Sequence, residues 1–341
     1  MSLSNALQRA WYRPGSWSQC LLPLSWLFRG IAALRRFRQQ RLAPNPPLPV
    51  PVIVVGNISV GGTGKTPLLA ALVTHFKSRG YRPGIISRGY GGKSDAYPLL
   101  VTPDSTADQV GDEPLLLAEL CPVVVSPDRY QAATYLLKQT DCNLLFSDDG
   151  LQHYRLPRDI ELVVVDGERG FGNRYCLPAG PLREPVSRLK QVDTVLVNET
   201  VSGLKLPDAE AFCLKPKVLH PLRGGSEVAP DQWQGGKCVH AVAGIGNPER
   251  FAHTLTRLGF EPILHPMPDH HLFREDELHF ADGLPVIITA KDAVKCARFA
   301  LDNVWVLDVV AVLDEGFLTR LEQRVADLIS AAPPNNAAAP K

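Results

Sequence analysis

The sequence predicts an α/β protein with a doubly wound, mostly parallel sheet, a second smaller α/β lobe and an N-terminal amphipathic helix. Short Val- and Ile-rich runs alternate with helical stretches between residues 51 and 198, which is typical of parallel sheets. A weaker alternation returns after residue 237. With 45% hydrophobic and 21% charged residues, the chain of 341 residues can bury the cores of two domains.

The N-terminal segment is basic, although the formal net charge of the chain is only +1. Thirteen of the 36 Lys and Arg residues precede Asp95, the first acidic residue, and seven of them are arginines within residues 1–41. An Arg-rich amphipathic helix with Trp and Phe favours the interface of an anionic bilayer. A basic helix packed on its own domain and an RNA-binding arm are the alternatives. No uninterrupted apolar run here is long enough to span a membrane.

A glycine-rich turn follows the first apolar run, residues 51–55, and precedes a helical stretch with Pro67 in its first turn. A strand, a glycine turn, Lys-Thr and a helix form a phosphate-binding P-loop, because backbone N–H groups and the helix N-terminus face the phosphate oxygens. In this pattern Lys65 contacts the β- and γ-phosphates and Thr66 binds Mg²⁺. Ser59 replaces the first Gly of the common motif. The expected nucleotide-binding residues are Gly61, Gly62, Thr63, Gly64, Lys65 and Thr66.

An acidic pair ends the apolar run of residues 143–148, where Asp148 and Asp149 precede Gly-x-Gln-His. A Walker B strand presents a carboxylate at its C-terminal end toward the nucleotide's Mg²⁺. Asp166 ends another apolar run, 160–166, and is the rival candidate. We favour Asp148 and Asp149 because a pair of carboxylates followed by Gln and His provides more polar and ionisable side chains than a single Asp at a strand end.

Two further segments are rich in glycine. The segment Arg88-Gly-Tyr-Gly-Gly-Lys93 carries two cations and can hold a second phosphate, but a simple mobile turn explains it equally well. Residues 167–188 form a long loop rich in Pro and Gly, and such loops are usually functional. Near residues 200–235 the alternation degrades, which indicates a hinge into the second lobe.

Together these motifs resemble those of the tetraacyldisaccharide 4'-kinase family of lipid A biosynthesis. The matching segments are Gly56–Pro67, Ser87–Gly91, Gly111–Pro114, Asp148–His153, Pro178–Pro185, Gly244–Pro248 and Asp269-His270. The family usually has Thr-Glu-Lys-Asp-Ala-Val-Lys late in the chain, and here Ala290 replaces the Glu. The resemblance implies a P-loop NTPase fold and an ATP-dependent kinase that phosphorylates the 4'-hydroxyl of a tetraacyldisaccharide 1-phosphate to form lipid IVA.

The resemblance also implies roles for particular residues. By the family analogy we expect Asp112 to be the general base, paired with His270 when the lobes close, although which of the two takes the proton first stays open. We expect Lys65 to hold the transferred phosphate. Thr66, Asp148, Asp149 and Glu113 are the expected Mg²⁺ ligands. A helix start alone would also favour Asp112 and Glu113. The expected substrate-binding residues are Arg88, Gln152, His153 and Arg183.

Four regions follow from this interpretation. Residues 1–43 form the membrane-contacting helix, 44–205 the P-loop kinase core, 206–330 the second lobe and 331–341 a disordered tail. The expected location is the cytoplasmic face of the inner membrane of a Gram-negative bacterium, with a peripheral attachment. The seven scattered cysteines contain no C-x-x-C pair, which fits reduced thiols in the cytosol.

The expected partners are the lipid disaccharide and the inner-membrane phospholipid surface, without nucleic acid or an obligate protein partner. The main alternative is a membrane-associated P-loop ATPase that moves or assembles a partner. A nucleic-acid kinase or GTPase is a weaker third interpretation, because no Asn-Lys-x-Asp motif is evident after Asn198.

Overall fold

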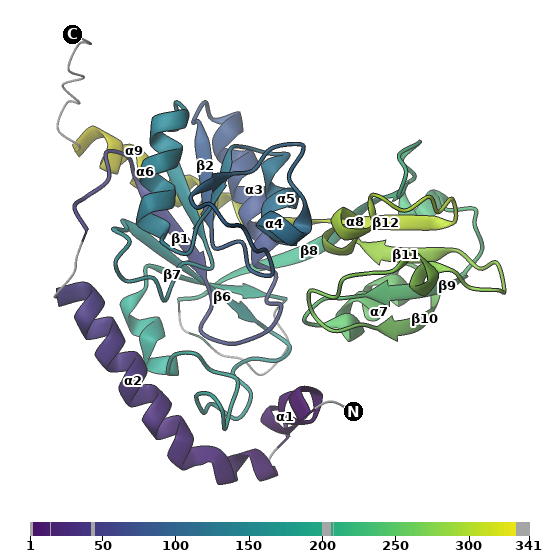
Figure 1. Cartoon of the computed structure of the whole chain (residues 1–341), viewed down its shortest axis with the longest axis horizontal. Helices are drawn as coiled ribbons and strands as arrows, with labels where there is room; N and C mark the ends of the chain where they lie inside the picture. The colour runs from purple at the N-terminus through teal and green to yellow at the C-terminus, as the bar shows by residue number, and fades with distance from the viewer. Residues whose placement is uncertain (1–2, 14, 42–44, 200–205, 207, 332–341) are drawn as a thin grey trace.

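The computed structural model describes residues 3–13, 15–41, 45–199, 206 and 208–331, and its strands form a 12-stranded, mostly parallel sheet (Figure 1). The strand order is β10-β9-β11-β12-β8-β7-β6-β1-β5-β2-β4-β3. The predicted fold class is confirmed. The tail expected to be disordered lies, except for Ala331, outside the described residues, as does the stretch 200–205 of the expected hinge.

The first lobe contains seven strands with helices on both faces. Six run parallel, and the short β3 pairs antiparallel at the edge. The strands are β1 (Val52–Gly56), β2 (Pro83–Ser87), β3 (Leu99–Leu100), β4 (Val123–Val125), β5 (Leu144–Asp148), β6 (Ile160–Asp166) and β7 (Thr194–Asn198). The helices are α3 (Lys65–Ser78), α4 (Ala107–Val110), α5 (Asp112–Ala118) and α6 (Arg129–Gln139), with a 3₁₀ turn η2 (Val186–Gln191).

Strand β1 lies between β5 and β6, at the point where the strand order reverses. Every residue of β1, β5 and β6 is buried, which explains their continuous apolar runs. In open parallel sheets, ligands bind beyond the carboxyl ends of the strands at such a reversal. The turn after β1 and the acidic pair after β5 both lie there.

The second lobe shares the same sheet. It contains β9 (Cys238–Ala243), α7 (Pro248–Arg257), β10 (Glu261–Pro266), β11 (Val286–Thr289) and α8 (Ala290–Cys296), with 3₁₀ turns η3 (Pro230–Gln232) and η4 (Glu275–Leu278). Two long antiparallel strands, β8 (Glu210–Pro221) and β12 (Val304–Leu313), connect it to the first lobe (Figure 1).

Two sequence-based expectations for this region need correction. The hinge expected near 200–235 contains β8, which the pattern did not reveal because this strand is half-exposed and carries Pro216 and several polar residues. Helix α9 (Glu315–Ala331), included in the expected second lobe, packs Phe317, Leu321 and Val325 into the core of the first lobe. The chain therefore leaves the first lobe along β8 and returns along β12.

The N-terminal segment folds as α1 (Leu3–Trp11), a 3₁₀ turn η1 (Trp17–Leu21) and α2 (Leu22–Arg41), which runs along the outside of the first lobe (Figure 1). Hydrogen bonds anchor it to the long loop: Trp11 Nε1 donates to Pro178 O at 2.9 Å and Ser25 Oγ to Cys176 O at 2.6 Å. The alternative of a helix packed on its own domain is thus partly correct. No helix in the described part of the chain is long and apolar enough to cross a bilayer.

Candidate active site

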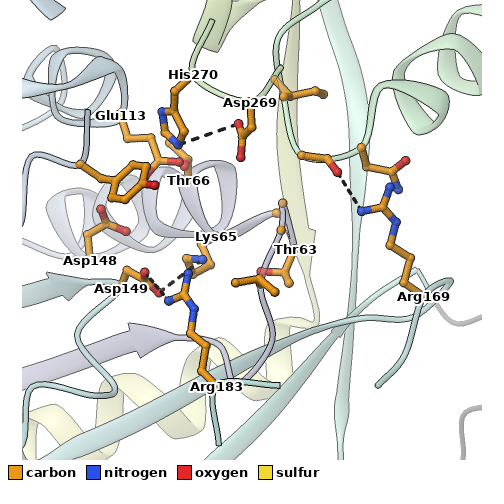
Figure 2. A pocket seen from close by; sticks show the side chains of 18 of the residues that line it. Thr63, Lys65, Thr66, Glu113, Asp148, Asp149, Arg169, Arg183, Asp269 and His270 are labelled. Atoms are coloured by element: carbon orange, nitrogen blue, oxygen red, sulfur yellow. Dashed lines mark hydrogen bonds and ion pairs between the residues drawn. The ribbon is translucent and has the colours of Figure 1, made fainter. Parts of the chain in front are cut away.

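A cavity of about 2320 Å³ lies between the lobes and the N-terminal helices. Its wall includes the glycine turn after β1, the loop after β2, the acidic pair after β5 and residues 266–270 and 289–291 of the second lobe. Figure 2 shows Lys65, Asp149 and Arg183 together on one side and His270 with Asp269 across from them. The volume exceeds that of a typical small-molecule pocket and suits a nucleotide together with a second substrate.

The glycine turn is held by buried amide side chains. Gly64 caps α3 with φ of +91°, and a Cβ added there would lie 2.5 Å from Nδ2 of Asn198. The same nitrogen donates to the carbonyl of Thr63 at 3.1 Å, and Asn57 Nδ2 lies 3.5 Å from the Thr63 hydroxyl. The sequence did not identify Asn198 or Asn57 as site residues, because their contact with the turn depends on the fold.

Two cations pair with Asp149 beside the turn. Its carboxylate lies 3.4 Å from Lys65 Nζ and accepts a hydrogen bond from Arg183 Nη1 at 2.7 Å. Burial opposes ionisation of Asp149, but the charges of Lys65 and Arg183 lower its pKa well below the usual value. Arg183, expected to bind substrate, thus lies beside the nucleotide-binding turn.

Asp148 is buried and incompletely paired. Its Oδ2 accepts from Ser87 Oγ at 2.9 Å, while Oδ1 has no hydrogen-bond partner. Burial, followed by the negative charges of Glu113 and Asp149, raises the pKa of Asp148. A divalent cation would relieve this repulsion, and the hydroxyl and carboxylate oxygens of Thr66, Asp148 and Glu113 are the donors that Mg²⁺ prefers.

Among the described residues, no three His, Cys, Asp or Glu side chains converge into a ready metal site. Asp166, the rival for the acidic position, forms an ion pair with Arg250 of α7 and accepts hydrogen bonds from the backbone N–H groups of Glu168 and Arg169. It therefore links the lobes.

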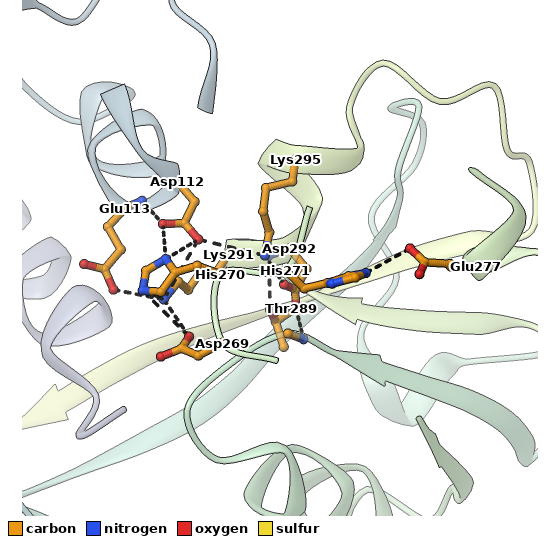
Figure 3. Close-up of polar contacts among 11 residues, drawn as sticks. Asp112, Glu113, Asp269, His270, His271, Glu277, Thr289, Lys291, Asp292 and Lys295 are labelled. Atoms are coloured by element: carbon orange, nitrogen blue, oxygen red, sulfur yellow. Dashed lines mark hydrogen bonds and ion pairs between the residues drawn. The ribbon is translucent and has the colours of Figure 1, made fainter. Parts of the chain in front are cut away.

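A carboxylate of the first lobe and an imidazole of the second lobe are in contact beside the cavity. Nδ1 of His270 lies 3.0 Å and 3.1 Å from the two oxygens of Asp112 (Figure 3). Burial opposes ionisation of Asp112, but the hydrogen bond from His270 and the charge of Lys291 lower its pKa. We expected the pair to assemble on lobe closure, and in this structure it is already formed.

Lys291, at the second position of α8, joins this pair to its neighbours. Its Nζ lies 3.2 Å from Glu113, 3.3 Å from Asp269 and 3.4 Å from Nε2 of His270. Burial opposes the charge of Lys291, but Glu113, Asp112 and Asp269 together raise its pKa. No role for Lys291 was evident from the sequence, since its partners lie far away along the chain.

A second basic region surrounds His153. Burial, and then the charges of Arg129, Arg88 and Arg35, lower the pKa of His153 to about 3. Arg129 is almost fully buried, and its Nε has no hydrogen-bond partner. The sequence indicated only a helix start at Arg129. Gln152, expected to bind substrate, lines the cavity but donates to Glu184 at 2.8 Å and to Asn57 O at 3.1 Å.

Comparison with known proteins decides the family. The family described as Tetraacyldisaccharide-1-P 4'-kinase matches residues 17–326. A tetraacyldisaccharide 4'-kinase of Pseudomonas syringae pv. syringae is 46% identical over 333 residues, covering 96% of this chain and 99% of that protein. One of Alkalilimnicola ehrlichii is 51% identical over 323 residues, covering 93% and 96% respectively. The chain belongs to the tetraacyldisaccharide 4'-kinase family.

A solved structure of this family has the same fold. The crystal structure of "apo" form LpxK from Aquifex aeolicus in complex with ATP superimposes with a TM-score of 0.75 at 28% identity, covering 92% of this chain and 99% of that one. Membership in the tetraacyldisaccharide 4'-kinase family makes the chain a kinase. It excludes the two alternatives, a membrane-associated ATPase that moves a partner and a nucleic-acid kinase or GTPase.

Proposed function

We propose that the chain transfers the γ-phosphoryl group of ATP to the 4'-hydroxyl of a tetraacyldisaccharide 1-phosphate, giving lipid IVA, with Mg²⁺ as the metal and His270 as the general base. The observation that carries the residue assignment is that the phosphate-binding turn and His270, which contacts buried Asp112, line the same cavity. The names of the relatives supply the substrate, and the ATP complex of the Aquifex aeolicus protein supplies the nucleotide.

The first lobe binds the nucleotide in this proposal. Backbone N–H groups of residues 61–66 and the N-terminus of α3 neutralise the phosphate oxygens. Lys65, now paired with Asp149 at 3.4 Å, would turn to the β- and γ-phosphates. Thr66, Asp148 and Glu113 would hold Mg²⁺, which neutralises charge on the transferred group. Arg183 then keeps Asp149 ionised beside the metal.

The second lobe supplies the proton acceptor. A sugar hydroxyl is a weak nucleophile at neutral pH, so a base that accepts its proton during transfer accelerates the reaction. With Nδ1–H of His270 donated to Asp112, the lone pair of Nε2 is available to the hydroxyl. Asp112 holds the ring and stabilises the imidazolium that forms, as a buried carboxylate does in other acid–base pairs.

The basic region around His153 suits the 1-phosphate of the acceptor. Arg35 from α2, Arg88 from the loop after β2 and Arg129 from α6 direct three positive charges at one uncharged imidazole. Guanidinium groups bind phosphate with matched hydrogen-bond geometry. An anion here would also satisfy the unpartnered Nε of buried Arg129.

Helix α2 has two distinct faces that suit a lipid substrate. Arg29, Arg35 and Arg36 line the cavity. Six apolar side chains of the helix are 52–64% exposed: Leu24, Trp26, Leu27, Ile31, Leu34 and Phe37. Of these, Trp26 and Ile31 also line the cavity, whereas the other four do not. An exposed apolar surface of this kind indicates an interaction site. We infer that it enters the cytoplasmic leaflet of the inner membrane, while the sugar-phosphate part of the acceptor passes beneath α2 into the cavity.

The test is an acceptor assay with γ-labelled ATP, Mg²⁺ and tetraacyldisaccharide 1-phosphate in detergent micelles. We expect the label in a bis-phosphorylated lipid, with Asp112→Ala and His270→Asn at least about a hundredfold slower. Free phosphate without a labelled lipid would refute the proposed transfer. Full activity in both variants would refute the proposed base.

A further inference from the structure

The ammonium group of Lys291 contacts both lobes and the proposed base at once. It reaches Glu113 of the first lobe at 3.2 Å and Asp269 of the second at 3.3 Å, and it lies 3.4 Å from Nε2 of His270 (Figure 3). Its side chain is 17% exposed. Lys291 thus contacts one nitrogen of the imidazole ring, Nε2, and Asp112 contacts the other, Nδ1.

Hydrogen-bond chemistry fixes the roles of the two ring nitrogens. An ammonium group has three donors and no acceptor, whereas an ionised carboxylate only accepts. With Lys291 donating to Nε2 and Asp112 accepting from Nδ1, the single hydrogen of the neutral ring lies on Nδ1. The charged or titratable groups facing the ring are Asp112, Asp269, Lys291 and Tyr90, whose ring centre is 4.8 Å away.

Helix α8 holds Lys291 in place through a buried network. Asp292 is fully buried and accepts from the backbone N–H of Gly244 at 3.0 Å and from the Thr289 hydroxyl at 2.8 Å. Its other oxygen accepts from Lys295 at 2.6 Å. Because these groups are satisfied within the second lobe, the position of the Lys291 backbone does not depend on the first lobe.

We propose that Lys291 is a positioning residue for the proton acceptor: its ammonium group holds Nε2 of His270, the nitrogen without hydrogen, in place until the acceptor hydroxyl replaces it. A contact of 3.4 Å is long for a hydrogen bond, so the hydroxyl can displace it while Lys291 retains Glu113 and Asp269. This inference rests on the proposed role of His270 as the base.

Lys295 provides a matched comparison. It extends from the same helix and lies 3.9 Å from Asp112 Oδ2, the same distance as Lys291, but its short contact is with Asp292. If Lys291 only joins the lobes by charge, its substitution should lower activity as much as substitution of Lys295 does. If Lys291 positions the base, its substitution should also change the spectrum of the His270 imidazole.

The test combines kinetics with ¹⁵N spectra of histidine-labelled protein, in which the His270 signals are assigned by their loss in His270→Asn. The variants are Lys291→Met, Lys291→Arg and Lys295→Met, with Lys138→Met on the exposed end of α6 as the control. We expect the neutral Nδ1–H form of His270 in the wild type, the Lys295 variant and the control. In Lys291→Met we expect Nδ1 to keep its hydrogen through Asp112, while the Nε2 signal moves to the position of a ring nitrogen that accepts no hydrogen bond.

The kinetic expectation is a kcat roughly 10- to 100-fold lower in Lys291→Met, with the KM for ATP within about threefold of wild type and partial recovery in Lys291→Arg. An unchanged Nε2 signal in Lys291→Met overturns the inference, as does an equal loss of kcat in the Lys295 and Lys291 variants. Failure of His270 as the base would appear separately, as full activity of His270→Asn.

Discussion

The two walls of the cavity are built in different ways. The wall of the first lobe binds phosphate mainly through the backbone of one short turn, residues 61–66, supported by side chains at the ends of neighbouring strands. The opposite wall depends on a cluster of side chains from both lobes, in which Asp112 of the first lobe meets His270 and Lys291 of the second, from segments more than 150 residues apart at the extreme. Nucleotide binding therefore depends on one lobe, whereas proton transfer depends on contact between two.

The largest effect should follow from removing the P-loop cation. Lys65→Ala leaves the phosphates without their main side-chain charge, and phosphoryl transfer depends mostly on electrostatic stabilisation of the transferred group. We expect kcat/KM for ATP to fall by about 10³-fold or more in the acceptor assay, while the melting temperature changes little. Normal turnover of the lipid by this variant would contradict the role of the first wall in holding the transferred phosphate.

Asp112→Asn should separate the two walls. The amide keeps the size of the carboxylate but cannot stabilise an imidazolium, so kcat should fall by about 10²-fold or more. The affinity for ATP, measured by calorimetry, should stay within about threefold, because the residues around the phosphates are unchanged. A parallel loss of ATP affinity would mean that the walls are not independent.

Asn198→Ala should weaken the first wall alone. It removes a buried hydrogen bond to the Thr63 carbonyl, which is worth about 1 kcal/mol. It also leaves empty the space beside Gly64 that the Asn198 amide now fills. We expect the KM for ATP to rise about tenfold and kcat to fall less than threefold. A drop in kcat at saturating ATP, with KM unchanged, would contradict a role in shaping the turn.

The smallest catalytic effect should come from the outer face of α2. Leu27→Ser together with Leu34→Ser removes exposed apolar side chains that do not line the cavity, so the stability of the fold should change by less than about 0.5 kcal/mol. Partitioning onto anionic phospholipid vesicles, measured by sedimentation, should fall severalfold, because less apolar area enters the bilayer. Unchanged partitioning would show that this face does not contact lipid.

The sequence predicted those parts of the molecule that local pattern determines. The turn after β1 and the acidic residues at the end of β5 depend on a strand and a few adjacent residues, so the sequence alone identified them. Strand β8 was missed because its exposed half is polar, and α9 was assigned to the wrong lobe because its apolar face says nothing about which core it joins.

The missed site residues share one property. Asn198, Arg129 and Lys291 contact groups between 19 and 178 residues away, and each has an ordinary explanation in its local sequence. Asn198 ends a strand, Arg129 begins a helix, and Lys291 follows a helix cap. What distinguishes them is the buried Nε of Arg129 and the charged neighbours of Lys291. These contacts form only in the folded protein, so the local sequence pattern does not predict them.

The central claim is that Asp112 and His270 act as one unit across the two lobes. A double-mutant cycle tests it most directly, with kcat measured for Asp112→Asn, His270→Asn and the double variant. Groups that act together are strongly non-additive, so we predict a double variant no more than about threefold slower than His270→Asn alone. A kcat reduced by the product of the two single effects would contradict this claim.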